Sequence, residues 1–442
     1  MEPFERQLGD LPDPLPIPIL RDPFEVTVQP PGSKSITNRA YILAALADGP
    51  SRLEHPLRSD DTDRLLAALE TLGTRVERHD DHVIVHGNDG RFPRGGAVNL
   101  GDGGTPTRFL LAASCLAAEP VTIDGSPRMR ERPVAEGVGL LRSLGADIDY
   151  LETAGQLPIV VRPSDDLVGG HLVVGRTASS QFISALLLIA PWLERGIDLS
   201  LREPTSESYI ELTIWILRRW EAAIRGGADT AGRRSISIAG QALRGREFAI
   251  EPDASSATYF AAAASMVPGS VVHLPGLGGA PQPDLECCHV FGELGADVRQ
   301  ADGTLTVRYL EPLAPRHELD MSLMPDATMT MAVAAATGRS PLTLTGLETL
   351  RVKETDRIAA IATELRKVGC EVEIVGDSVT IIPPPRHERP VTVETYNDHR
   401  MAMAFGVLGL VRPNISVANP ACVGKSYPGY WHDLARLYTY HA

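Results

Sequence analysis

Positively charged side chains stand at two places where a helix is expected to begin. Lys34, followed by Arg39, belongs to SKSITNRAYILAALADG, and Arg400, next to His399, belongs to DHRMAMAFGVLGLV; in both, a polar cluster leads into an apolar stretch. A helix N-terminus presents free N–H groups and a partial positive charge, so it favours anions. A cation at a helix N-terminus is disfavoured by the helix dipole, so its presence there needs a separate explanation. Binding an anionic ligand is such a reason.

Other expected helix starts carry glycine, hydroxyl, amide or carboxylate groups. They include Gly103, Gly104 and Thr105, then Ser179, Ser180 and Gln181, and Asp326. Each could act only as a cap, because Ser, Thr, Asp and Gly are ordinary N-cap residues. We expect such ends to gather three to a domain, where their dipoles add up to an anion-binding face.

Two clusters of basic residues precede expected outer helices. They are Arg128, Arg130 and Arg132 in SPRMRERP, and Arg351, Lys353, Glu354 and Arg357 in LRVKETDR. On a helix, Lys353 and Arg357 are four residues apart and share a face. A solvated charged surface is one interpretation. Capture of a carboxylate or phosphate is the other, since arginine binds these groups with two parallel hydrogen bonds.

The chain repeats itself six times. A Leu-Gly-Ala-like ending followed by an alternating stretch recurs every 72 to 76 residues, at Gly73, Gly145, Gly295 and Gly369, with Glu221 in the glycine's place in a weaker copy. A second series of alanine-rich helices runs in phase, starting at Ser33, Gly103, Ser179, Ser255, Asp326 and Asp398. A fixed period of this length indicates a repeated architecture.

Each repeat is interpreted as β–α–β–α–β–β, with an amphipathic outer helix that ends at a glycine and an inner helix that is apolar all round. Six such units exceed one core, so we expect three per domain. The predicted domains are residues 33–250 and a discontinuous domain of residues 1–32 with 251–442. The proline-rich segment 11–24 is expected to be a lead-in or an edge strand.

The composition is that of a soluble globular protein. Of 442 residues, 43% are hydrophobic and 22% charged, and the net charge of −14 argues against binding nucleic acid or an anionic membrane. The longest apolar run, 182–193, is too short to span a bilayer. The N-terminus lacks a signal-peptide pattern, and five cysteines without metal-type spacing indicate a reducing cytoplasm. The lack of a long apolar surface helix favours a monomer.

Apparent nucleotide and metal motifs fail on spacing. The GKS of Gly424–Ser426 would need a glycine where Asn419 stands, so it is not a P-loop. Gly276–Gly279 does not complete a dinucleotide fingerprint, and Cys287–His289 lacks the spacing of metal ligands.

Five segments together resemble the 5-enolpyruvylshikimate-3-phosphate (EPSP) synthase family: PGSKSITNRA (Pro31–Ala40), PRMRERP (Pro127–Pro133), RVKETDR (Arg351–Arg357), ATELRKVG (Ala362–Gly369) and YNDHRMAM (Tyr396–Met403). The resemblance runs from about Pro31 to the C-terminus. It implies an α/β fold known as a two-domain inside-out α/β barrel, with six βαβαββ repeats, three per domain. It also implies transfer of the enolpyruvyl group of phosphoenolpyruvate to the 5-hydroxyl of 3-phosphoshikimate, a step of the shikimate pathway of aromatic amino acid biosynthesis. No metal or organic cofactor is implied, and the family is the target of glyphosate.

The resemblance also implies site residues. Asp326 would accept the proton of the attacking hydroxyl, Glu354 would protonate the enol methylene, and Lys34 would assist proton transfer. The residues implied for 3-phosphoshikimate are Lys34, Ser35, Arg39, Ser179, Ser180, Gln181, Ser206, Tyr209, Asp326 and Lys353. Those implied for phosphoenolpyruvate are Lys34, Gly104, Arg132, Gln181, Arg357, Arg400 and Lys425.

Three positions depart from the family pattern, and two rival functions stay open. Asp102 and Thr349 stand where the family usually has Asn, and Phe109 where it has Pro. One rival is the sibling transferase that acts on UDP-N-acetylglucosamine with a loop cysteine as acid, but the stretch around Pro127–Pro133 has none, and Cys115 falls in an apolar helix. The other is a non-catalytic anion-binding protein, which would not need Asp326, Glu354 and Lys34 together.

Overall fold

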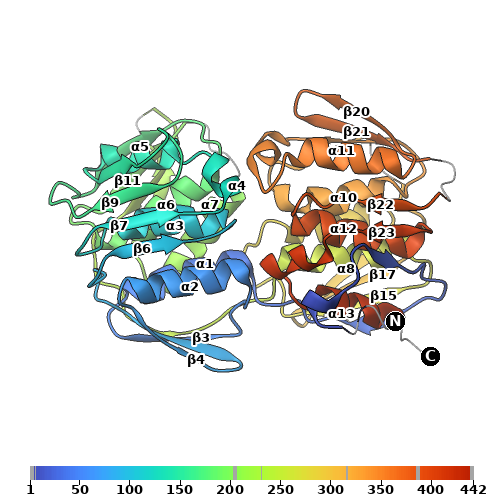
Figure 1. Cartoon of the computed structure of the whole chain (residues 1–442), viewed down its shortest axis with the longest axis horizontal. Helices are drawn as coiled ribbons and strands as arrows, with labels where there is room; N and C mark the ends of the chain where they lie inside the picture. The colour runs from blue at the N-terminus through green and yellow to red at the C-terminus, as the bar shows by residue number, and fades with distance from the viewer. Residues whose placement is uncertain are drawn as a thin grey trace. The chain divides into compact units, whose positions relative to one another are not determined.

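Two compact units make up the chain. A computed structural model describes residue 4 and residues 6–202, 207–229, 231–314, 317–384 and 389–438. Gly32–Glu251 form one unit, here called the inserted unit, and Met1–Pro31 join Pro252–Ala442 in the other, the terminal unit. Figure 1 shows both, with the chain coloured from blue at the N-terminus to red at the C-terminus.

Small mixed sheets recur along both units. In the inserted unit three four-stranded sheets have the orders β14-β3-β5-β4, β6-β7-β9-β8 and β10-β11-β13-β12. Their strands are β3 (Pro50–Glu54), β4 (Arg75–Arg78), β5 (His82–His86), β6 (Gly96–Asn99), β7 (Val121–Asp124), β8 (Asp147–Tyr150), β9 (Ile159–Arg162), β10 (Gly170–Val174), β11 (Ile197–Leu201), β12 (Ile224–Ala228), β13 (Arg234–Ile238) and β14 (Glu247–Ala249).

The terminal unit repeats this plan. Its described sheets have the orders β16-β17-β15-β2, β18-β19-β21-β20 and, with three strands, β1-β23-β22. Their strands are β1 (Leu15–Ile17), β2 (Glu25–Thr27), β15 (Val271–Pro275), β16 (Ala296–Ala301), β17 (Thr304–Tyr309), β18 (Glu318–Asp320), β19 (Leu342–Thr345), β20 (Glu371–Val375), β21 (Ser378–Ile382), β22 (Val391–Val393) and β23 (Ile415–Val417).

Each four-stranded sheet has one parallel pair and two antiparallel pairs. In the second sheet, β6 runs parallel to β7 with Gly96 opposite Val121, and β7 runs antiparallel to β9 with Val121 opposite Val161. Parallel neighbours need a crossover connection, and an inner helix supplies it. These repeated sheets and helices confirm the expected α/β fold class.

Two strands are exchanged at the junctions between the units. β2 precedes the first inner helix in sequence, yet it pairs in parallel with β15, which follows the fourth inner helix. β14 precedes the fourth inner helix, yet it pairs in parallel with β3, which follows the first. Each unit therefore contains a strand that comes just before a helix of the other.

Six inner helices form the core. They are α1 (Lys34–Leu46), α3 (Gly104–Ser114), α6 (Ser180–Ile189), α8 (Ala254–Met266), α10 (Thr328–Ala335) and α12 (His399–Val411). In α8 every residue except Ser255 is buried, and in α12 every residue except Val411. Such helices cannot face solvent on any side, so the sheets and outer helices surround them.

The outer helices are amphipathic and end where the sequence predicts. They are α2 (Asp60–Thr71), α5 (Ala135–Ser143), α7 (Glu207–Arg219), α9 (Leu285–Glu293), α11 (Arg357–Lys367) and the shorter α13 (Tyr430–Ala435), with α4 (Pro127–Glu131) as an added turn. The expected terminal glycines have φ of 96° (Gly73), 102° (Gly145), 123° (Gly295) and 91° (Gly369), and Glu221 adopts φ 61° in the same place. The predicted helix ends, including the irregular one, are confirmed.

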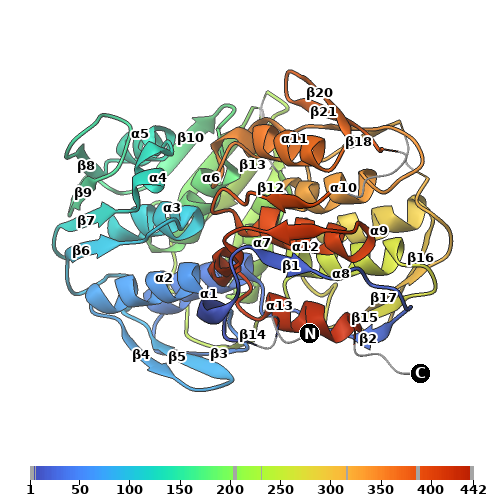
Figure 2. The same cartoon turned by 45° about the vertical axis from the view of Figure 1, so that its right-hand side comes forward.

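The proline-rich N-terminal segment includes an edge strand. β1 runs antiparallel to β23, with Leu15 opposite Val417, and so joins the last sheet of the terminal unit. In Figure 2, β1 and β2 appear as dark blue strands among elements coloured red and yellow. Prolines that flank and interrupt β1 remove backbone donors, which suits a sheet edge. Among the described residues, no helix is both long and apolar enough to cross a bilayer.

Candidate active site

Asp326 lies at the centre of a cluster of cations in the terminal unit. It sits in the 3₁₀ turn η4 (Pro325–Ala327) that leads into α10. Its Oδ1 accepts hydrogen bonds from Lys353 Nζ at 3.3 Å and Arg357 Nη1 at 3.0 Å. Its Oδ2 accepts from Arg400 Nη2 at 3.0 Å. Three positive groups from three different elements therefore converge on one carboxylate.

A buried ion pair joins the starts of α11 and α12. Asp398 is the N-cap of α12, and its two carboxylate oxygens lie 2.7 Å from Arg357 Nε and 3.2 Å from Nη2. Arg357 is only 1% exposed. Burial alone would lower the pKa of Arg357, but the carboxylates of Asp398, Glu354 and Asp326 raise it above its ordinary value. The guanidinium therefore stays charged without contact with water.

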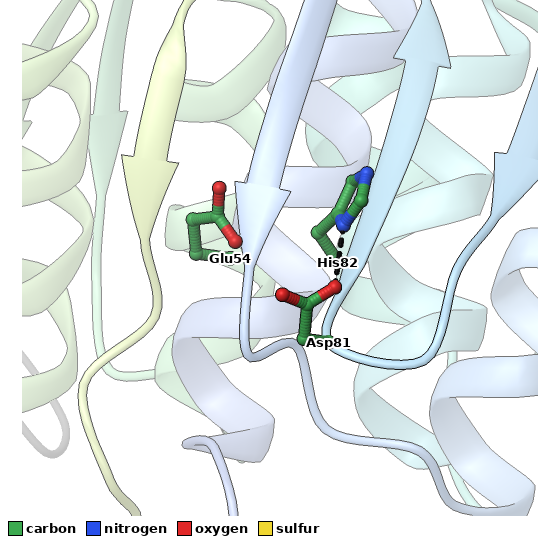
Figure 3. A group of neighbouring side chains, drawn as sticks. All are labelled: Glu54, Asp81 and His82. Carbon is green, nitrogen blue, oxygen red and sulfur yellow. Dashed lines mark hydrogen bonds and ion pairs between the residues drawn. The ribbon is translucent and has the colours of Figure 1, made fainter.

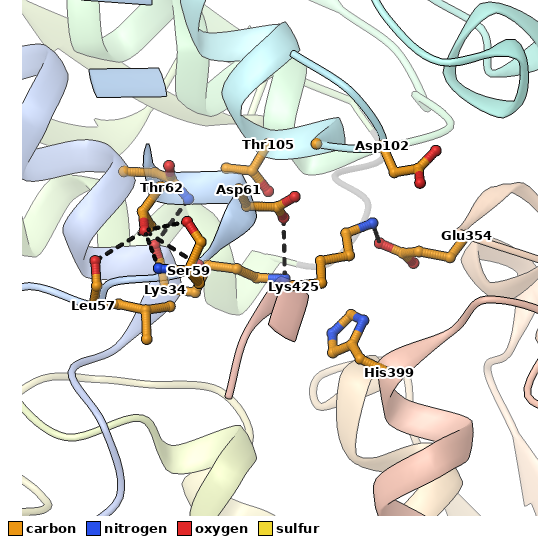
Figure 4. Close-up of polar contacts among 12 residues, drawn as sticks. Lys34, Leu57, Ser59, Asp61, Thr62, Asp102, Thr105, Glu354, His399 and Lys425 are labelled. Atoms are coloured by element: carbon orange, nitrogen blue, oxygen red, sulfur yellow. Dashed lines mark hydrogen bonds and ion pairs between the residues drawn. The ribbon is translucent and has the colours of Figure 1, made fainter. Parts of the chain in front are cut away.

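Glu354 links two cations. Its Oε1 accepts from Lys425 Nζ and its Oε2 from Arg357 Nη2, both at 2.9 Å. Lys425 ends the 3₁₀ segment η6 (Pro420–Lys425). Figure 4 shows the side chains of Lys425 and Glu354 pointing toward each other. All six residues implied for this part of the chain thus meet in one hydrogen-bonded network, namely Asp326, Lys353, Glu354, Arg357, Arg400 and Lys425.

Asp284, at the N-terminus of α9, is a buried carboxylate that the sequence did not single out. It is 1% exposed, and its carboxylate accepts a hydrogen bond from the Ser255 hydroxyl in the first turn of α8. Burial, together with the negative charge of Asp326, raises the pKa of Asp284 to about 6, although Arg400 opposes the shift. Only the packing of α8 against α9 brings these residues together, so no local motif marks them.

In the inserted unit, Lys34 at the start of α1 faces an acidic partner. Its Nζ lies 3.5 Å from Asp61 Oδ2, and the Asp61 side chain is 5% exposed. Figure 4 shows this pair and the polar network of Ser59 and Thr62 that begins α2. An acidic first turn suits the helix dipole. The run SDDTD was therefore a usable signal for Asp61, but it was not singled out.

One arginine of the cluster in α4 turns inward. Arg132 is 4% exposed, and its Nη1 donates to the backbone oxygen of Asp102 at 3.3 Å. Arg130 instead pairs with Asp124, and Arg128 pairs with Glu131 on the surface. The cluster thus divides into one buried cation and two solvated ones.

Arg132 lies against the backbone of Gly104. A Cβ atom built on Gly104 would stand 2.6 Å from Arg132 Nη2, 2.7 Å from Nη1 and 2.8 Å from Cζ. Carbon–nitrogen contacts this short do not occur without a shift of one partner. Gly104 is therefore needed for the observed position of the Arg132 guanidinium.

The three departures from the family pattern have different local settings. The Asp102 carboxylate accepts a hydrogen bond from the Ser126 hydroxyl, while its backbone oxygen serves Arg132. Phe109 is buried, and the Arg39 guanidinium lies 5.0 Å from its ring centroid. The Thr349 hydroxyl is buried without a hydrogen-bond partner among the described residues.

Arg39 is a buried cation bound mainly to neutral groups. Its guanidinium donates to the hydroxyls of Thr213 at 2.9 Å and Ser184 at 3.3 Å, and to the backbone oxygens of Ser35 at 2.9 Å and Tyr209 at 3.2 Å. Burial lowers the pKa of Arg39 to about 10. The network holds α1, α6 and α7 together. Ser206 lies outside the described residues.

The start of α6 carries the remaining implied residues. The Ser179 side chain caps the helix by accepting from the backbone N–H of Gln181 at 3.3 Å, and Ser180 is 4% exposed. Gln181 Oε1 accepts from Arg108 Nη1 at 2.5 Å, and its Nε2 donates to Thr105 Oγ1 at 2.8 Å. Contacts between α3 and α6 thus fix the Gln181 side chain.

A second cluster, Glu54, Asp81 and His82, has the side-chain types of a metal site. Its candidate ligand atoms lie within 4.8 Å of one another (Figure 3). However, Arg52 donates to Glu54 Oε1 at 2.5 Å and lies 2.6 Å from His82 Nε2. A cation would have to displace a guanidinium from two of the three ligands, so we assign no ion to this cluster.

The rival with a cysteine acid is not supported. Cys115 follows α3, is 6% exposed, and its sulfur donates to the Leu111 carbonyl at 3.6 Å. Burial raises the pKa of the Cys115 thiol to about 12. A thiol in this setting stays protonated at neutral pH, so it is a poor acid catalyst.

Comparison with solved structures defines the class of the fold. The EPSP synthase of Acinetobacter baumannii is similar with a TM-score of 0.79 and 25% identity, over 95% of this chain and 97% of that one. The enolpyruvyl transferase NikO of Streptomyces tendae is similar in fold, with a TM-score of 0.72 and 17% identity over 96% and 97% of the two chains. The fold is that of the enolpyruvyl transferases.

Sequence comparison is more specific. The model of the family described as EPSP synthase (3-phosphoshikimate 1-carboxyvinyltransferase) matches residues 21–434. The 3-phosphoshikimate 1-carboxyvinyltransferase of Methanoculleus marisnigri is 40% identical over 417 residues, which is 93% of this chain and 96% of that protein. The chain belongs to the EPSP synthase family, and the resemblance read from its motifs is confirmed.

Proposed function

We propose that this chain transfers the enolpyruvyl group of phosphoenolpyruvate to the 5-hydroxyl of 3-phosphoshikimate and releases inorganic phosphate. The observation that carries the proposal is the convergence of Lys353, Arg357 and Arg400 on Asp326. These cations suit substrates that bear carboxylate and phosphate groups. The carboxylate among them suits a reaction that must remove a proton from a hydroxyl.

The proton transfers fall to two carboxylates. Asp326 takes the proton of the 5-hydroxyl as the hydroxyl oxygen bonds to C2 of phosphoenolpyruvate, and gives that proton to the phosphate when it leaves. Glu354 gives a proton to C3 in the addition and takes one back from C3 when the C–O bond to phosphate breaks. Lys425, at 2.9 Å from Glu354 Oε1, is placed to exchange protons with it. Lys34 assists proton transfer, and preorganised cations stabilise the leaving phosphate.

The two substrates are assigned to two sets of side chains that share Lys34 and Gln181. We assign 3-phosphoshikimate to Lys34, Ser35, Arg39, Ser179, Ser180, Gln181, Ser206, Tyr209, Asp326 and Lys353. We assign phosphoenolpyruvate to Lys34, Gly104, Arg132, Gln181, Arg357, Arg400 and Lys425. The burial of Arg132 at 4% exposed supports this assignment, because a desolvated cation binds an anion more strongly than a solvated one does.

The setting of the enzyme is part of the proposal. We propose a monomer in a reducing cytoplasm that binds small molecules and not nucleic acid. All five cysteines are free thiols, which is consistent with a reducing compartment. The net charge of −14 disfavours a polyanionic partner.

Phosphate release tests the proposal. The purified chain is incubated with 3-phosphoshikimate and phosphoenolpyruvate, and each is omitted in turn. We expect release only when both are present. Arg132→Ala should abolish most of it, and Arg128→Ala, which alters a solvated arginine of the same cluster, should not. Release without 3-phosphoshikimate, or equal activity of the two variants, would contradict the proposal.

A further inference from the structure

A left-handed turn precedes the helix that carries Arg400. Tyr396 has φ 54° and Asn397 has φ 57°, and Asp398 then caps α12. Asparagine tolerates this backbone region, but an aromatic residue there costs about 1 kcal/mol or more. Such a turn persists only where neighbouring groups hold it.

A buried carboxylate holds the turn on one side. Glu364 of α11 is fully buried, and its Oε1 accepts a hydrogen bond from the Tyr396 hydroxyl at 2.7 Å. Its Oε2 accepts from the backbone N–H of Glu394 at 3.1 Å and pairs with Lys367 Nζ at 2.8 Å. Burial, and then Glu364, raise the pKa of Tyr396 to about 12, so the hydroxyl remains a donor at neutral pH.

The same face of α11 also holds the end of the turn. Arg357 and Glu364 are seven residues apart, which is two helical turns, so both side chains leave one face. Arg357 binds the carboxylate of Asp398, and Glu364 binds Tyr396. Because α11 binds the turn through both side chains, it fixes the residue at which α12 begins and the position of the Arg400 side chain.

The turn also reaches the segment that carries Lys425. Asn397 Oδ1 accepts from Asn419 Nδ2 at 3.1 Å. Asn419 has φ 45° and comes directly before η6, the segment that ends at Lys425. One two-residue turn is thus bonded to the elements that carry three of the assigned cations.

We propose that Tyr396 and Asn397 are positioning residues: held by Glu364 and Asn419, they set the positions from which Arg400 and Lys425 bind the anionic substrate. The identity of that substrate, phosphoenolpyruvate, rests on the proposed function. Neither residue belongs to the assigned binding set, and both act through the groups that they orient.

Tyr396→Phe removes the hydroxyl and keeps the ring. Loss of one hydrogen bond that positions a cation should raise the KM for phosphoenolpyruvate about three- to tenfold. The dissociation constant for 3-phosphoshikimate, measured by calorimetry, should stay within about twofold of that of the wild type. Tyr438→Phe is the matched control, because it removes another tyrosine hydroxyl bond of the terminal unit, to the Pro18 carbonyl, and should change neither value.

Asn397→Gly keeps the left-handed backbone without strain and removes the side chain that bonds to Asn419, so it decides the question if Tyr396→Phe does not fold. This variant should also raise the KM for phosphoenolpyruvate and leave the dissociation constant for 3-phosphoshikimate unchanged. Unchanged KM in both variants would overturn the inference, and so would equal weakening of both substrates with a lowered melting temperature. Binding of inorganic phosphate can be measured by calorimetry without turnover. If the wild type binds phosphate but releases none from the two substrates, the proposed function is contradicted and the positioning role of the turn is not.

Discussion

Replacing Gly104 by alanine should act through Arg132 rather than through the helix that Gly104 begins. The new methyl carbon would stand 2.6 to 2.8 Å from three atoms of the guanidinium. Carbon atoms prefer about 3.5–4.0 Å from their neighbours, so the guanidinium must retreat by about 1 Å. The end of an arginine side chain can make such a shift, and the fold should therefore survive.

The displacement should cost most of what Arg132 contributes to binding. A hydrogen bond between a charged donor and an acceptor contributes about 1.5–3 kcal/mol, which corresponds to about 10- to 150-fold in kcat/KM. A 1 Å misplacement of a positioning group is itself able to cost about a hundredfold. We expect kcat/KM for phosphoenolpyruvate to fall within this range, with the dissociation constant for 3-phosphoshikimate altered less than about threefold.

Steady-state phosphate release at varied phosphoenolpyruvate measures the effect. Gly139→Ala is the control, because a Cβ on that exposed glycine of α5 meets nothing within 4 Å. Glyphosate offers a second readout. It should compete with phosphoenolpyruvate in the wild type, and its inhibition constant should rise in Gly104→Ala.

A double-mutant cycle can refute the reasoning. Arg132→Ala removes the group that the methyl would displace, so Gly104→Ala should add little to it. If the two losses in kcat/KM instead multiply, the methyl group lowers activity independently of Arg132. If the single variant Gly104→Ala has the kcat/KM and the glyphosate sensitivity of the wild type, Arg132 does not face the substrate.

Three further predictions concern a base, a helix end and a buried acid. Asp326→Asn should lower turnover about 10²- to 10⁴-fold, as removal of a general base does. Binding of 3-phosphoshikimate, measured by calorimetry, should persist. Weaker binding at normal turnover would show that Asp326 is a substrate ligand and not a base. Glu221→Gly should stabilise the fold by about 0.5–1 kcal/mol, because a φ of 61° is strained for Glu and not for Gly. The ion pair with Arg246 that is lost is exposed and contributes little to stability. A lower melting temperature in thermal melts would contradict this prediction. The pKa of Asp284 is raised to about 6 in the folded chain, so its contribution to stability is present below about pH 4 and lost as the pH rises to 6. Urea unfolding of Asp284→Asn should then show a gain over the wild type that grows between pH 4 and 6, and a gain that is independent of pH would refute it.

The repeat pattern was enough to predict the six inner helices and the ends of five outer helices, but it did not predict the short α4. The period located the C-terminus of α7 at Glu221 although no glycine marks it, because the neighbouring repeats fix the length of each unit. Helix starts such as Asp398 were readable because capping chemistry is local. Whatever depends on residues within one turn of each other can be predicted from the sequence.

Long-range partners could not be predicted in this way. Arg128, Arg130 and Arg132 are equivalent in sequence. Arg130 pairs with two acids outside the cluster, Asp124 at the end of β7 and Glu152. The burial of Asp284 depends on Ser255, twenty-nine residues earlier. No local pattern marks the partner strand of β2 or β14, since each looks like a strand before an inner helix; the count of repeats is what led us to predict residues 1–32 with 251–442.

The pairing of β1 with β23 also sets an order for folding on the ribosome. The inserted unit has its last strand once residue 249 has emerged, whereas Leu15 must wait for Val417. At about 5–20 residues per second, that wait is roughly 20–80 s. During it, the nascent terminal unit carries an apolar strand without a partner. Pro14, Pro16 and Pro18 remove three of the five backbone donors of residues 14–18, which leaves this segment few N–H groups for pairing with other nascent chains before its own partner is made.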